Sequence, residues 1–302
     1  MRMSPRLSFL QWFFGRRRAA TKNVPEYVPE YTAPDLARIN SPDPAKIQVT
    51  WVGHATFLIQ VAGLNILTDP IWSERAFMVQ FLGPRRQARP GIAFEDLPTI
   101  DLVLVSHTHY DHLDRRTILK LGDAPQYIVP TGVARWFTKE RIKNVTELSW
   151  WQSTTVRALA IYSVPAKHWS MRWILRKEEA GWGGYVIESP AGGIYFVGDT
   201  AYDESYFKQI GERFLDIAVA LIPIGAYHPR HIFQGVHIDP QEAVIIHQEV
   251  GAKQSIGMHW GVFKMTEEKL HEPPLQLMQE VAAARIPPEE FSVMKFGETK
   301  IL

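Results

Sequence analysis

Residues 106–114 hold the densest group of metal-binding side chain types in the chain. They read SHTHYDHLD and directly follow an apolar stretch that predicts a buried strand. In extended backbone alternate side chains point the same way, so His107 and His109 can approach one ion, while a turn brings Asp111 and His112 toward a second. Imidazole and carboxylate ligands suit zinc, and also iron or manganese. The segment therefore predicts a metal centre.

Four residues do not complete the coordination shells of two ions, so further ligands are expected where other strands end. Three residues fit this expectation, because His168, Asp199 and His259 each follow a predicted strand closely. The sequence has no cysteine, which excludes thiolate sites. We therefore predict two divalent metal ions, with zinc as the first choice, held by histidine and aspartate side chains.

The elements that must position these residues begin near Ile47. Strands are predicted at 48–52, 57–61 and 65–68, where β-branched and aromatic residues are bounded by glycine and Asp-Pro. Alternating strands and helices follow, with strands at 101–105, 127–130, 154–164, 184–188, 194–197, 216–224 and 254–258 and helices at 115–121, 133–142 and 240–250. This order predicts an α/β fold in which two β-sheets pack together with helices outside.

The first 46 residues differ in composition from the rest, and we expect the folded domain that carries the metal centre to span 47–302. Residues 24–46 contain five prolines without periodicity, which predicts an extended lead-in that wraps on the body or links to it. Before them, residues 7–14 are mostly apolar and aromatic, and residues 16–18 are three arginines. This basic and aromatic arm favours attachment to an anionic bilayer, and the alternative is a disordered or packed terminal arm.

The location and partners follow from the same features. The apolar run is too short to span a bilayer, and arginines stand where a secretory signal would have small residues, so export is the less favoured alternative. The chain has a formal net charge of +1, but residues 1–25 hold six basic and no acidic residues, which leaves 27 basic and 32 acidic groups in the remainder. A mildly acidic body argues against a nucleic-acid surface. We expect a cytoplasmic protein, peripheral on the inner membrane face.

The metal-binding residues and their surroundings resemble the metallo-β-lactamase superfamily. Within it the closest resemblance is to N-acylphosphatidylethanolamine-hydrolysing phospholipase D and its bacterial relatives, over about residues 47–265. The resemblance is carried by WVGHAT at 51–56, TDPIW at 68–72, GPRR at 83–86, SHTHYDHLD at 106–114, HW at 168–169, GDT at 198–200, IPIGAY at 222–227, HIDPQEA at 237–243 and HWG at 259–261.

This resemblance implies a metallo-β-lactamase-type αβ/βα sandwich with a two-metal site between the sheets. It implies the following ligands: His107, His109 and His168 for the first ion, Asp111, His112 and His259 for the second, and Asp199 as the bridge. A bridging carboxylate would serve both ions at once.

Four further residues are candidates near the metal centre. The resemblance implies that His237 faces the substrate headgroup, and Tyr110 either packs or touches substrate at the rim. His54 and Asp69 lie at the ends of early strands, where they either orient metal ligands through hydrogen bonds or serve as ordinary turn residues. Asp111 and His237 are the candidate catalytic residues.

The resemblance implies a binuclear phosphodiesterase of phospholipase D type. Two cations would lower the pKa of a shared water so that hydroxide attacks the phosphorus, and N-acylphosphatidylethanolamine would give phosphatidic acid and an N-acylethanolamine. His237 or a water on the metal would protonate the leaving oxygen. The alternatives are a hydrolase of the same fold acting on a lactone or a soluble phosphodiester, and a non-enzymatic metal-binding or scaffold protein.

The remaining histidines, His228, His231, His247 and His271, are expected on the surface of loops or helices. Trp169 and Trp260 stand directly beside two proposed ligands. Aromatic side chains there would suit an acyl chain or a lipid headgroup, although most tryptophans are expected in the core.

Overall fold

A computed structural model of the chain describes residues 28–172 and 180–302, and the predicted arm lies outside the described residues. Within this part the strands form two sheets of seven strands each. The first sheet has the order β14-β1-β2-β3-β4-β5-β6, with strands β1 (Gln48–Gly53), β2 (Thr56–Val61), β3 (Leu64–Thr68), β4 (Leu102–Leu104), β5 (Gln126–Pro130), β6 (Val145–Leu148) and β14 (Thr299–Ile301).

The second sheet has the order β13-β12-β11-β10-β9-β8-β7. Its strands are β7 (Ser153–Val156), β8 (Leu159–Val164), β9 (Gly184–Ser189), β10 (Gly192–Phe196), β11 (Ile217–Pro223), β12 (Gln254–Met258) and β13 (Phe291–Ser292). Both sheets combine antiparallel pairs with parallel ones, such as β1 with β2 and β3 with β4 in the first sheet. In the second sheet β9 and β10 are antiparallel, whereas β10, β11 and β12 are parallel.

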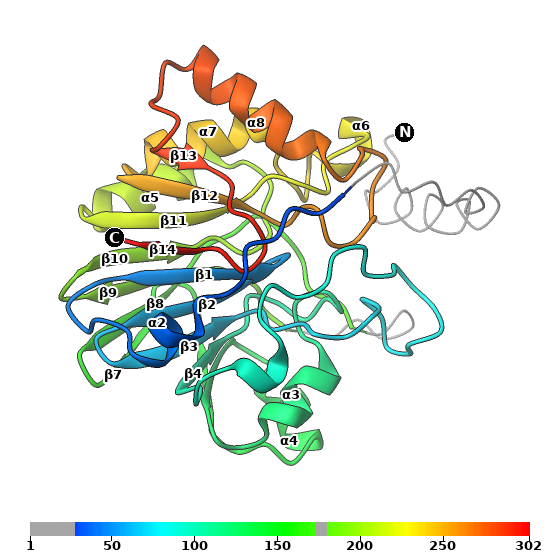
Figure 1. The fold of residues 1–302 in the computed structure, drawn as a ribbon, viewed down its shortest axis with the longest axis vertical. Coiled ribbons are helices and arrows are strands. Elements are labelled where there is room, and N and C mark those ends of the chain that lie inside the picture. Colours follow the sequence, from blue (N-terminus) through cyan, green and yellow to red (C-terminus); the bar gives the residue numbers. More distant parts are fainter. Residues whose placement is uncertain (1–27, 173–179) are drawn as a thin grey trace.

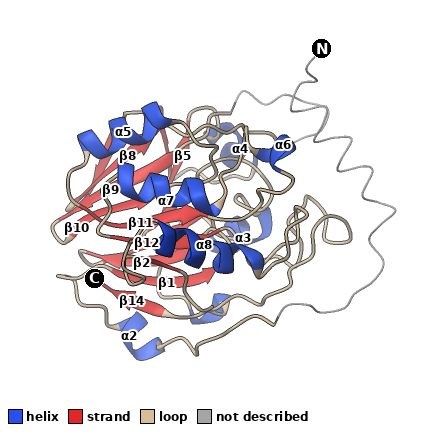
Figure 2. Ribbon diagram, turned by 90° about the horizontal axis from the view of Figure 1, so that it is seen from above, coloured by secondary structure: helices blue, strands red, loops and turns tan. Residues whose placement is uncertain are grey.

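Helices cover the outer faces of the two sheets, as Figure 1 shows with α7 and α8 above the strands and α3 and α4 below them. The helices are α2 (Leu36–Asn40), α3 (Arg115–Leu121), α4 (Ala134–Lys139), α5 (Glu204–Arg213), α6 (Arg230–Phe233), α7 (Pro240–Glu249) and α8 (Glu272–Ala283), with a 3₁₀ turn at Phe94–Asp96. Figure 2 shows α5, α7 and α8 side by side over the second sheet.

The two sheets and the helices on their outer faces make four layers, and an apolar core lies between each pair of adjacent layers. Between the sheets, Trp51 and Phe57 of the first sheet pack with Ile187 and Phe196 of the second, and all four are fully buried. A second core joins the second sheet to α5, α7 and α8, and a third joins the first sheet to α2, α3 and α4. The predicted αβ/βα sandwich is confirmed, because burying both faces of each sheet requires helices on the outside and the other sheet on the inside.

The predicted helix at 240–250 begins and ends as its sequence suggests. The Asp239 side chain accepts a hydrogen bond from Glu242 N, and the Glu242 side chain accepts one from Asp239 N, which makes a capping box. Pro240 occupies the first turn, where its missing N–H costs nothing. Gly251 follows the helix with a φ of 61°, in the left-handed region that favours glycine.

The single strand predicted at 154–164 is wrong. The structure has the hairpin of β7 and β8 there, with Arg157 in the turn at a φ of 50°. The turn contains no glycine, proline or asparagine, so the continuous run of β-forming residues concealed it.

The described part of the proline-rich lead-in packs on the first sheet. Ile39 of α2 is fully buried, and its carbonyl accepts a hydrogen bond from Gln60 Nε2 at 2.7 Å. Tyr31 forms an isolated bridge with Phe296. Among the helices of residues 28–172 and 180–302, none has the length and apolar character needed to cross a bilayer. The domain boundary at residue 46 stays a prediction.

Candidate metal centre

The predicted metal-binding residues lie at one edge of the sandwich, where strands of both sheets end. His107 follows β4 in the first sheet, while His168, Asp199 and His259 follow β8, β10 and β12 in the second. The latter three strands run in the same direction, because β8 and β10 are both antiparallel to β9 and β10, β11 and β12 are parallel. Their carboxyl ends therefore meet at a common edge, which is where sheet proteins build sites.

Three histidine nitrogens converge in the first group. His107 Nε2 lies 2.8 Å from His109 Nδ1, and His168 Nε2 lies 3.3 Å from the same atom. The His107 and His109 rings come from alternate residues of one extended segment, as their spacing predicts. The three side chains form a group that could hold a metal ion.

A second group lies next to the first and contains Asp111, His112 and His259. Asp111 Oδ2 lies 3.2 Å from His112 Nε2 and 3.4 Å from His259 Nε2, and these two nitrogens are 3.2 Å apart. His54 joins this group from the turn between β1 and β2, with its Nε2 2.9 Å from Asp111 Oδ2.

Asp199 lies between the two groups. Its carboxylate oxygens are 3.2 Å from both His112 Nε2 and His259 Nε2, and Oδ2 is 3.9 Å from His107 Nε2 and 3.8 Å from His168 Nε2. The side chain is almost fully buried. This position matches the bridging role that the sequence resemblance implies for Asp199.

Hydrogen bonds from outside the cluster orient the histidine rings. Asp69 accepts hydrogen bonds from Ser106 N at 2.7 Å and from Ser106 Oγ at 2.5 Å, and its Oδ2 lies 2.6 Å from His112 Nδ1. Since the Ser106 hydroxyl gives its proton to Asp69, the contact of 2.9 Å between His107 Nδ1 and Ser106 Oγ makes the His107 ring the donor. His168 Nδ1 donates to Val236 O at 2.8 Å.

These contacts leave the Nε2 atoms of His107, His112 and His168 directed into the cluster. Such outer hydrogen bonds are the usual way in which proteins set the tautomer of a metal-binding histidine. Of the two roles left open for Asp69, the structure favours orientation of the histidine rings, and His54 contacts Asp111 directly.

Backbone strain accompanies this arrangement. His54, Asp69 and His259 have φ values of 56°, 33° and 62°, which non-glycine residues rarely adopt. His259 N also donates to His54 O at 3.1 Å, which joins two of these residues. Residues held in such conformations concentrate at functional sites, where the surrounding structure stabilises them.

The buried carboxylates of the cluster favour positive charge on His112, whereas burial opposes charge on His107 and His109. Burial lowers the pKa of His109 to about 3 and lowers that of His107 well below its usual range. Burial opposes charge on Asp199, but His112 and His259 hold the pKa of this carboxyl well below its usual range. Burial also opposes charge on His112, yet Asp199, Asp111 and Asp69 raise its pKa well above the usual value.

The donor set fits divalent metal ions. The Nδ1–H groups of His107 and His168 donate hydrogen bonds away from the cluster, so the Nε2 atom of each ring faces His109 Nδ1 with a lone pair. A proton on His109 Nδ1 can bond to only one of these two lone pairs at a time. A cation shared by the three nitrogens would satisfy all of them and offset the charge of the nearby carboxylates. Nitrogen and oxygen ligands of this kind suit zinc, iron and manganese.

The two residues predicted to face substrate have different surroundings. His237 lies at the edge of the cluster, with Nδ1 3.8 Å from Asp199 Oδ2 and its ring centroid 5.2 Å from that of His168. Tyr110 donates its hydroxyl proton to Arg172 O, and its ring lies 5.3 Å from the ring of Phe77. Of the two alternatives for Tyr110, this contact supports packing beside the metal motif, and substrate contact stays a prediction.

Two residues that sequence patterns did not single out support the site. The Arg172 guanidinium donates to Thr108 O at 3.2 Å and to Leu113 O at 2.7 Å, so it spans the loop that carries four of the predicted ligands. Glu268 accepts hydrogen bonds from Ala226 N at 2.7 Å and His228 N at 3.1 Å. Isolated charged residues of this kind carry no local signal, because their partners are distant in the sequence.

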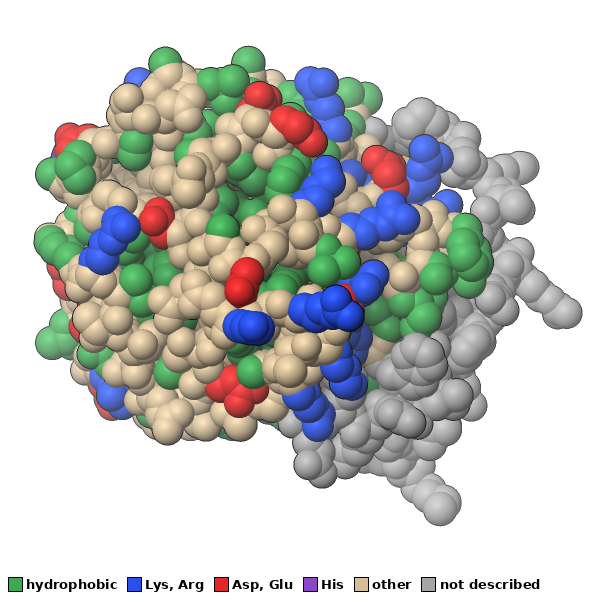
Figure 3. All heavy atoms as spheres, turned by 90° about the horizontal axis from the view of Figure 1, so that it is seen from below, with side chains coloured by type: hydrophobic (Ala, Val, Ile, Leu, Met, Phe, Trp, Pro, Cys, Tyr) green, Lys and Arg blue, Asp and Glu red, His purple; other side chains and the backbone are tan. Residues whose placement is uncertain are grey.

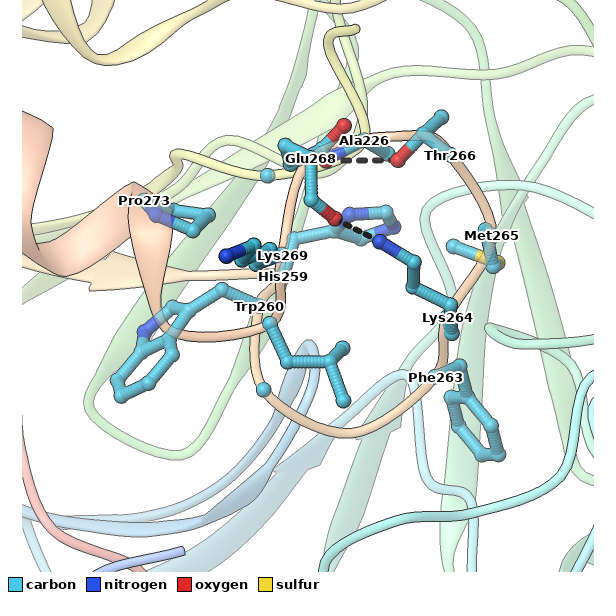
Figure 4. Close-up of a pocket in the computed structure, with 13 residues that line it drawn as sticks. Ala226, His259, Trp260, Phe263, Lys264, Met265, Thr266, Glu268, Lys269 and Pro273 are labelled. Carbon is cyan, nitrogen blue, oxygen red and sulfur yellow. Dashed lines mark hydrogen bonds between the residues drawn. The ribbon is translucent and has the colours of Figure 1, made fainter. Parts of the chain in front are cut away.

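A pocket opens beside the second group of ligands. Figure 4 shows its lining, which includes His259 and Trp260 from the end of β12, and Phe263, Lys264 and Glu268 from the loop that follows. Lys264 Nζ donates to Glu268 O in this loop. The Trp169 ring lies 4.5 Å from that of His109 on the other group. Aromatic side chains therefore adjoin both groups of predicted ligands.

The surface location predicted for His247 is wrong. His247 belongs to α7, and its side chain is buried between this helix and the second sheet, with Nδ1 2.8 Å from Ser255 Oγ of β12. Its position on the inner face of the helix, with apolar residues on the same face, explains the burial. His228 and His231 are exposed as predicted, and His271 is half-buried.

Comparison with known proteins places this geometry in a family. The profile described as "Beta-lactamase superfamily domain" matches residues 64–260. The chain is 37% identical over 248 residues to "N-acyl-phosphatidylethanolamine-hydrolyzing phospholipase D 1" of Caenorhabditis elegans, with 78% of this chain and 70% of the nematode protein covered. It is 35% identical over 243 residues to an uncharacterized protein of Mycobacterium tuberculosis, with 78% of this chain and 64% of that protein covered.

A solved structure agrees on the fold. A possible metal-dependent hydrolase from Veillonella parvula superimposes with a TM-score of 0.69 at 18% identity, covering 85% of this chain and all of the other. The chain spans less than two thirds of the mycobacterial relative, so the similarity covers the shared domain and not the whole of that protein. The fold, the matched domain and the identity to the nematode protein show that the chain belongs to the metallo-β-lactamase superfamily and, within it, to the family of N-acylphosphatidylethanolamine-hydrolysing phospholipase D.

Proposed function

We propose that the chain is a binuclear metal-dependent phosphodiesterase of phospholipase D type, which hydrolyses N-acylphosphatidylethanolamine-like lipids to phosphatidic acid and an N-acylethanolamine. At the coarser level, its family and its histidine and aspartate cluster make it a metal-dependent hydrolase. The observation that carries the proposal is the convergence of seven side chains into two adjacent groups with Asp199 between them.

We assign His107, His109 and His168 to one divalent ion, Asp111, His112 and His259 to the other, and Asp199 to both. Zinc is the first choice, with iron or manganese as alternatives. When bound, two such ions supply positive charge that lowers the pKa of water and stabilises the charge that builds up on a phosphate.

The side chains of the protein perform the other tasks. In the reaction a water oxygen forms the new bond to phosphorus, the bond between phosphorus and the ethanolamine oxygen breaks, and the leaving oxygen takes a proton. His237 can hold that proton at the edge of the cluster, and Arg230 fixes its backbone by donating to His237 O at 2.8 Å. Asp69 and Val236 keep the rings of His112 and His168 oriented.

Product analysis tests this proposal. Protein purified with divalent metal should convert N-acylphosphatidylethanolamine in mixed micelles to phosphatidic acid and N-acylethanolamine, detected by mass spectrometry. The matched control is the variant His107→Ala/His109→Ala, which should show only background conversion. Hydrolysis of a lactone or a soluble phosphodiester without conversion of the lipid would favour the alternative substrates, and no turnover of any of them would favour a non-enzymatic role.

The number of ions is a separate prediction. Elemental analysis of metal-supplemented protein should give about two ions per chain, since seven ligands exceed what one tetrahedral or octahedral site needs while leaving room for water. No more than one tightly held ion after supplementation would contradict the binuclear assignment.

The proposal extends to location and partners. We propose a cytoplasmic protein that associates with the inner membrane face, where its phospholipid substrate resides. Residues 7–18, which support this on composition, lie outside the described residues. The absence of a nucleic-acid partner likewise stays a prediction.

A further inference from the structure

A loop beside the metal motif presents apolar side chains to solvent. This apolar loop, residues 77–82, connects segments that end in Arg75 and Arg85, which form an isolated antiparallel bridge. Met78 is 42% exposed, Phe81 75% and Leu82 42%. Figure 1 shows this part of the chain within the cyan segment that projects to the right, away from both sheets. Exposed apolar side chains gathered on one projecting loop indicate an interaction surface.

Hydrogen bonds at its base hold the loop in this form. Arg75 Nη1 donates to Gly83 O at 2.7 Å, and Ala76 N donates to Pro84 O at 3.1 Å. The Gln80 side chain turns back to the base, where Nε2 donates to Arg75 O and Oε1 accepts from Arg75 N. The polar side chain of Gln80 thus pairs with the backbone of Arg75 at the base, while Met78, Phe81 and Leu82 are exposed to solvent.

Phe77 connects the loop to the site. A Cβ on Gly83, which has a φ of 87°, would lie 2.5 Å from Phe77 Cβ, so Phe77 packs tightly against the end of the loop. The Phe77 ring also lies 5.3 Å from that of Tyr110, which stands between the predicted ligands His109 and Asp111. Whatever the loop contacts is therefore held close to the candidate metal centre.

The charges around the loop favour an anionic partner. Arg85 is exposed at its base, close to the exposed Glu74, and the exposed Arg89 follows shortly along the chain. Figure 3 shows the molecule from below, with lysine and arginine side chains interspersed with hydrophobic and a few acidic ones toward its right side. Cations around an apolar tip are the arrangement by which interfacial segments enter the headgroup region of anionic bilayers.

The shape of the loop separates a bilayer from a protein partner. A projecting apolar tip requires a complementary cavity on a protein, whereas a fluid bilayer accepts it without one. We propose that residues 77–82 insert into the headgroup and acyl boundary of an anionic lipid bilayer, with Phe81 as the main contact. This inference rests on the proposed action on phospholipids, because it explains how the metal centre would reach a substrate embedded in a membrane.

The absence of cysteine from the sequence permits a direct test on the full chain. Phe81→Cys is labelled with an environment-sensitive fluorophore, and Leu215→Cys, which replaces an 86% exposed leucine between α5 and β11, is labelled as the matched control. Vesicles of phosphatidylcholine and phosphatidylglycerol without any N-acylphosphatidylethanolamine are then added. The probe at position 81 should shift to shorter wavelength and be quenched by brominated lipid, and the probe at 215 should do neither.

Vesicle sedimentation provides a second measurement. Met78→Ser/Phe81→Ser should lower the affinity for these vesicles on the order of tenfold or more, as expected from losing the burial of two apolar side chains. Leu215→Ser/Leu275→Ser, which removes two exposed leucines elsewhere, should leave it unchanged. High salt should weaken binding of the unaltered chain, because screening acts on the arginines.

Two outcomes would overturn the inference. Equal responses of the two probes, or none, would show that the loop does not enter the bilayer. A shift at position 81 that appears without vesicles and grows with protein concentration would mean that the loop packs on a second copy of the chain. Because these vesicles contain no substrate, loop insertion without conversion of N-acylphosphatidylethanolamine in micelles would refute the proposed function alone, and conversion without insertion would refute the loop alone.

Discussion

At the scale of single residues, Asp199 makes the sharpest prediction. Among residues 28–172 and 180–302, it is the carboxylate that lies within 4 Å of ring nitrogens in both groups of predicted ligands. Asp199→Ala should therefore reduce hydrolysis more than any single histidine change, by at least about a hundredfold, since even residues that only orient ligands cost 10- to 100-fold. Activity and metal content of Asp199→Ala and His168→Ala, measured side by side, check this. Equal small losses would contradict the bridging assignment.

Arg172 is a second residue with a specific expectation. Its guanidinium donates to carbonyls at both ends of the metal motif and lies 4.8 Å from the rings of Tyr110 and Trp136. Arg172→Met should weaken metal binding by about tenfold while the fold persists, because the loop loses the donor that sets its ligand geometry. Arg172→Lys should rescue only partly, since an ammonium lacks the planar fork.

A chelator competition assay with circular dichroism measures the effect of Arg172→Met. Arg213→Met serves as the control, because Arg213 also stacks on aromatic rings but lies on α5. If both variants bind metal as tightly as the unaltered chain, Arg172 does not position the ligands.

The predicted ligands could be found from the sequence because their signal is local. His107, His109, Asp111 and His112 lie within one short segment, and the other three each follow an apolar strand. Arg172 and Glu268 could not be found in this way, because each acts on backbone carbonyls or N–H groups far from it in the sequence. No local pattern distinguishes such a residue from an exposed charge.

At the scale of elements, strong periodicity and clear turn signals decided what could be predicted. Most strands of both sheets were predicted near their observed positions. β14 was not predicted, because it has only three residues and is defined by its pairing with β1 from the far end of the chain. The sequence did not predict the helix α5. This helix contains Gly211, a poor helix former, and only glycine fits there because a Cβ would come within 2.1 Å of Glu249 O in α7. Packing between elements, which sequence patterns do not encode locally, determines such choices.

His247 links α7 to β12 and predicts a dependence of stability on pH. Burial lowers the pKa of His247 below its usual value of 6.5, although Glu290 opposes this. Below about pH 6.5 the unfolded chain therefore binds a proton that the folded chain resists, so this residue contributes stability at neutral pH that is lost as the pH falls. The loss in the free energy of unfolding between pH 7 and pH 5.5 should therefore be smaller in His247→Gln than in the unaltered chain.

Urea denaturation at several pH values measures this difference. The metal-binding histidines also respond to acid, but they are present in both proteins, so the comparison isolates His247. His231→Gln is the matched control, because His231 is exposed and should leave the pH dependence unchanged. Identical pH profiles for His247→Gln and the unaltered chain would contradict the assigned cause.

At the scale of the whole molecule, two separate segments are expected to contact the same membrane. The arm combines Phe9, Trp12 and Phe13 with the arginines at 16–18. Apolar burial and charge attraction are modest separately but can together hold a protein on an anionic surface. Deletion of residues 2–22 should therefore lower binding to anionic vesicles and hydrolysis of bilayer substrate, while hydrolysis of a short soluble phosphodiester stays nearly unchanged because the predicted ligands lie beyond residue 100.

The combination of this deletion with Met78→Ser/Phe81→Ser tests whether the arm and the apolar loop act together. If both contact one bilayer, attachment through either raises the effective concentration of the other near the surface, so losing both should weaken vesicle binding by more than either loss alone. Sedimentation of all four proteins with the same vesicles measures these effects. If the truncated chain sediments as well as the intact one, the arm does not anchor the protein, and any membrane attachment must then come from the folded domain, with the loop as its first candidate.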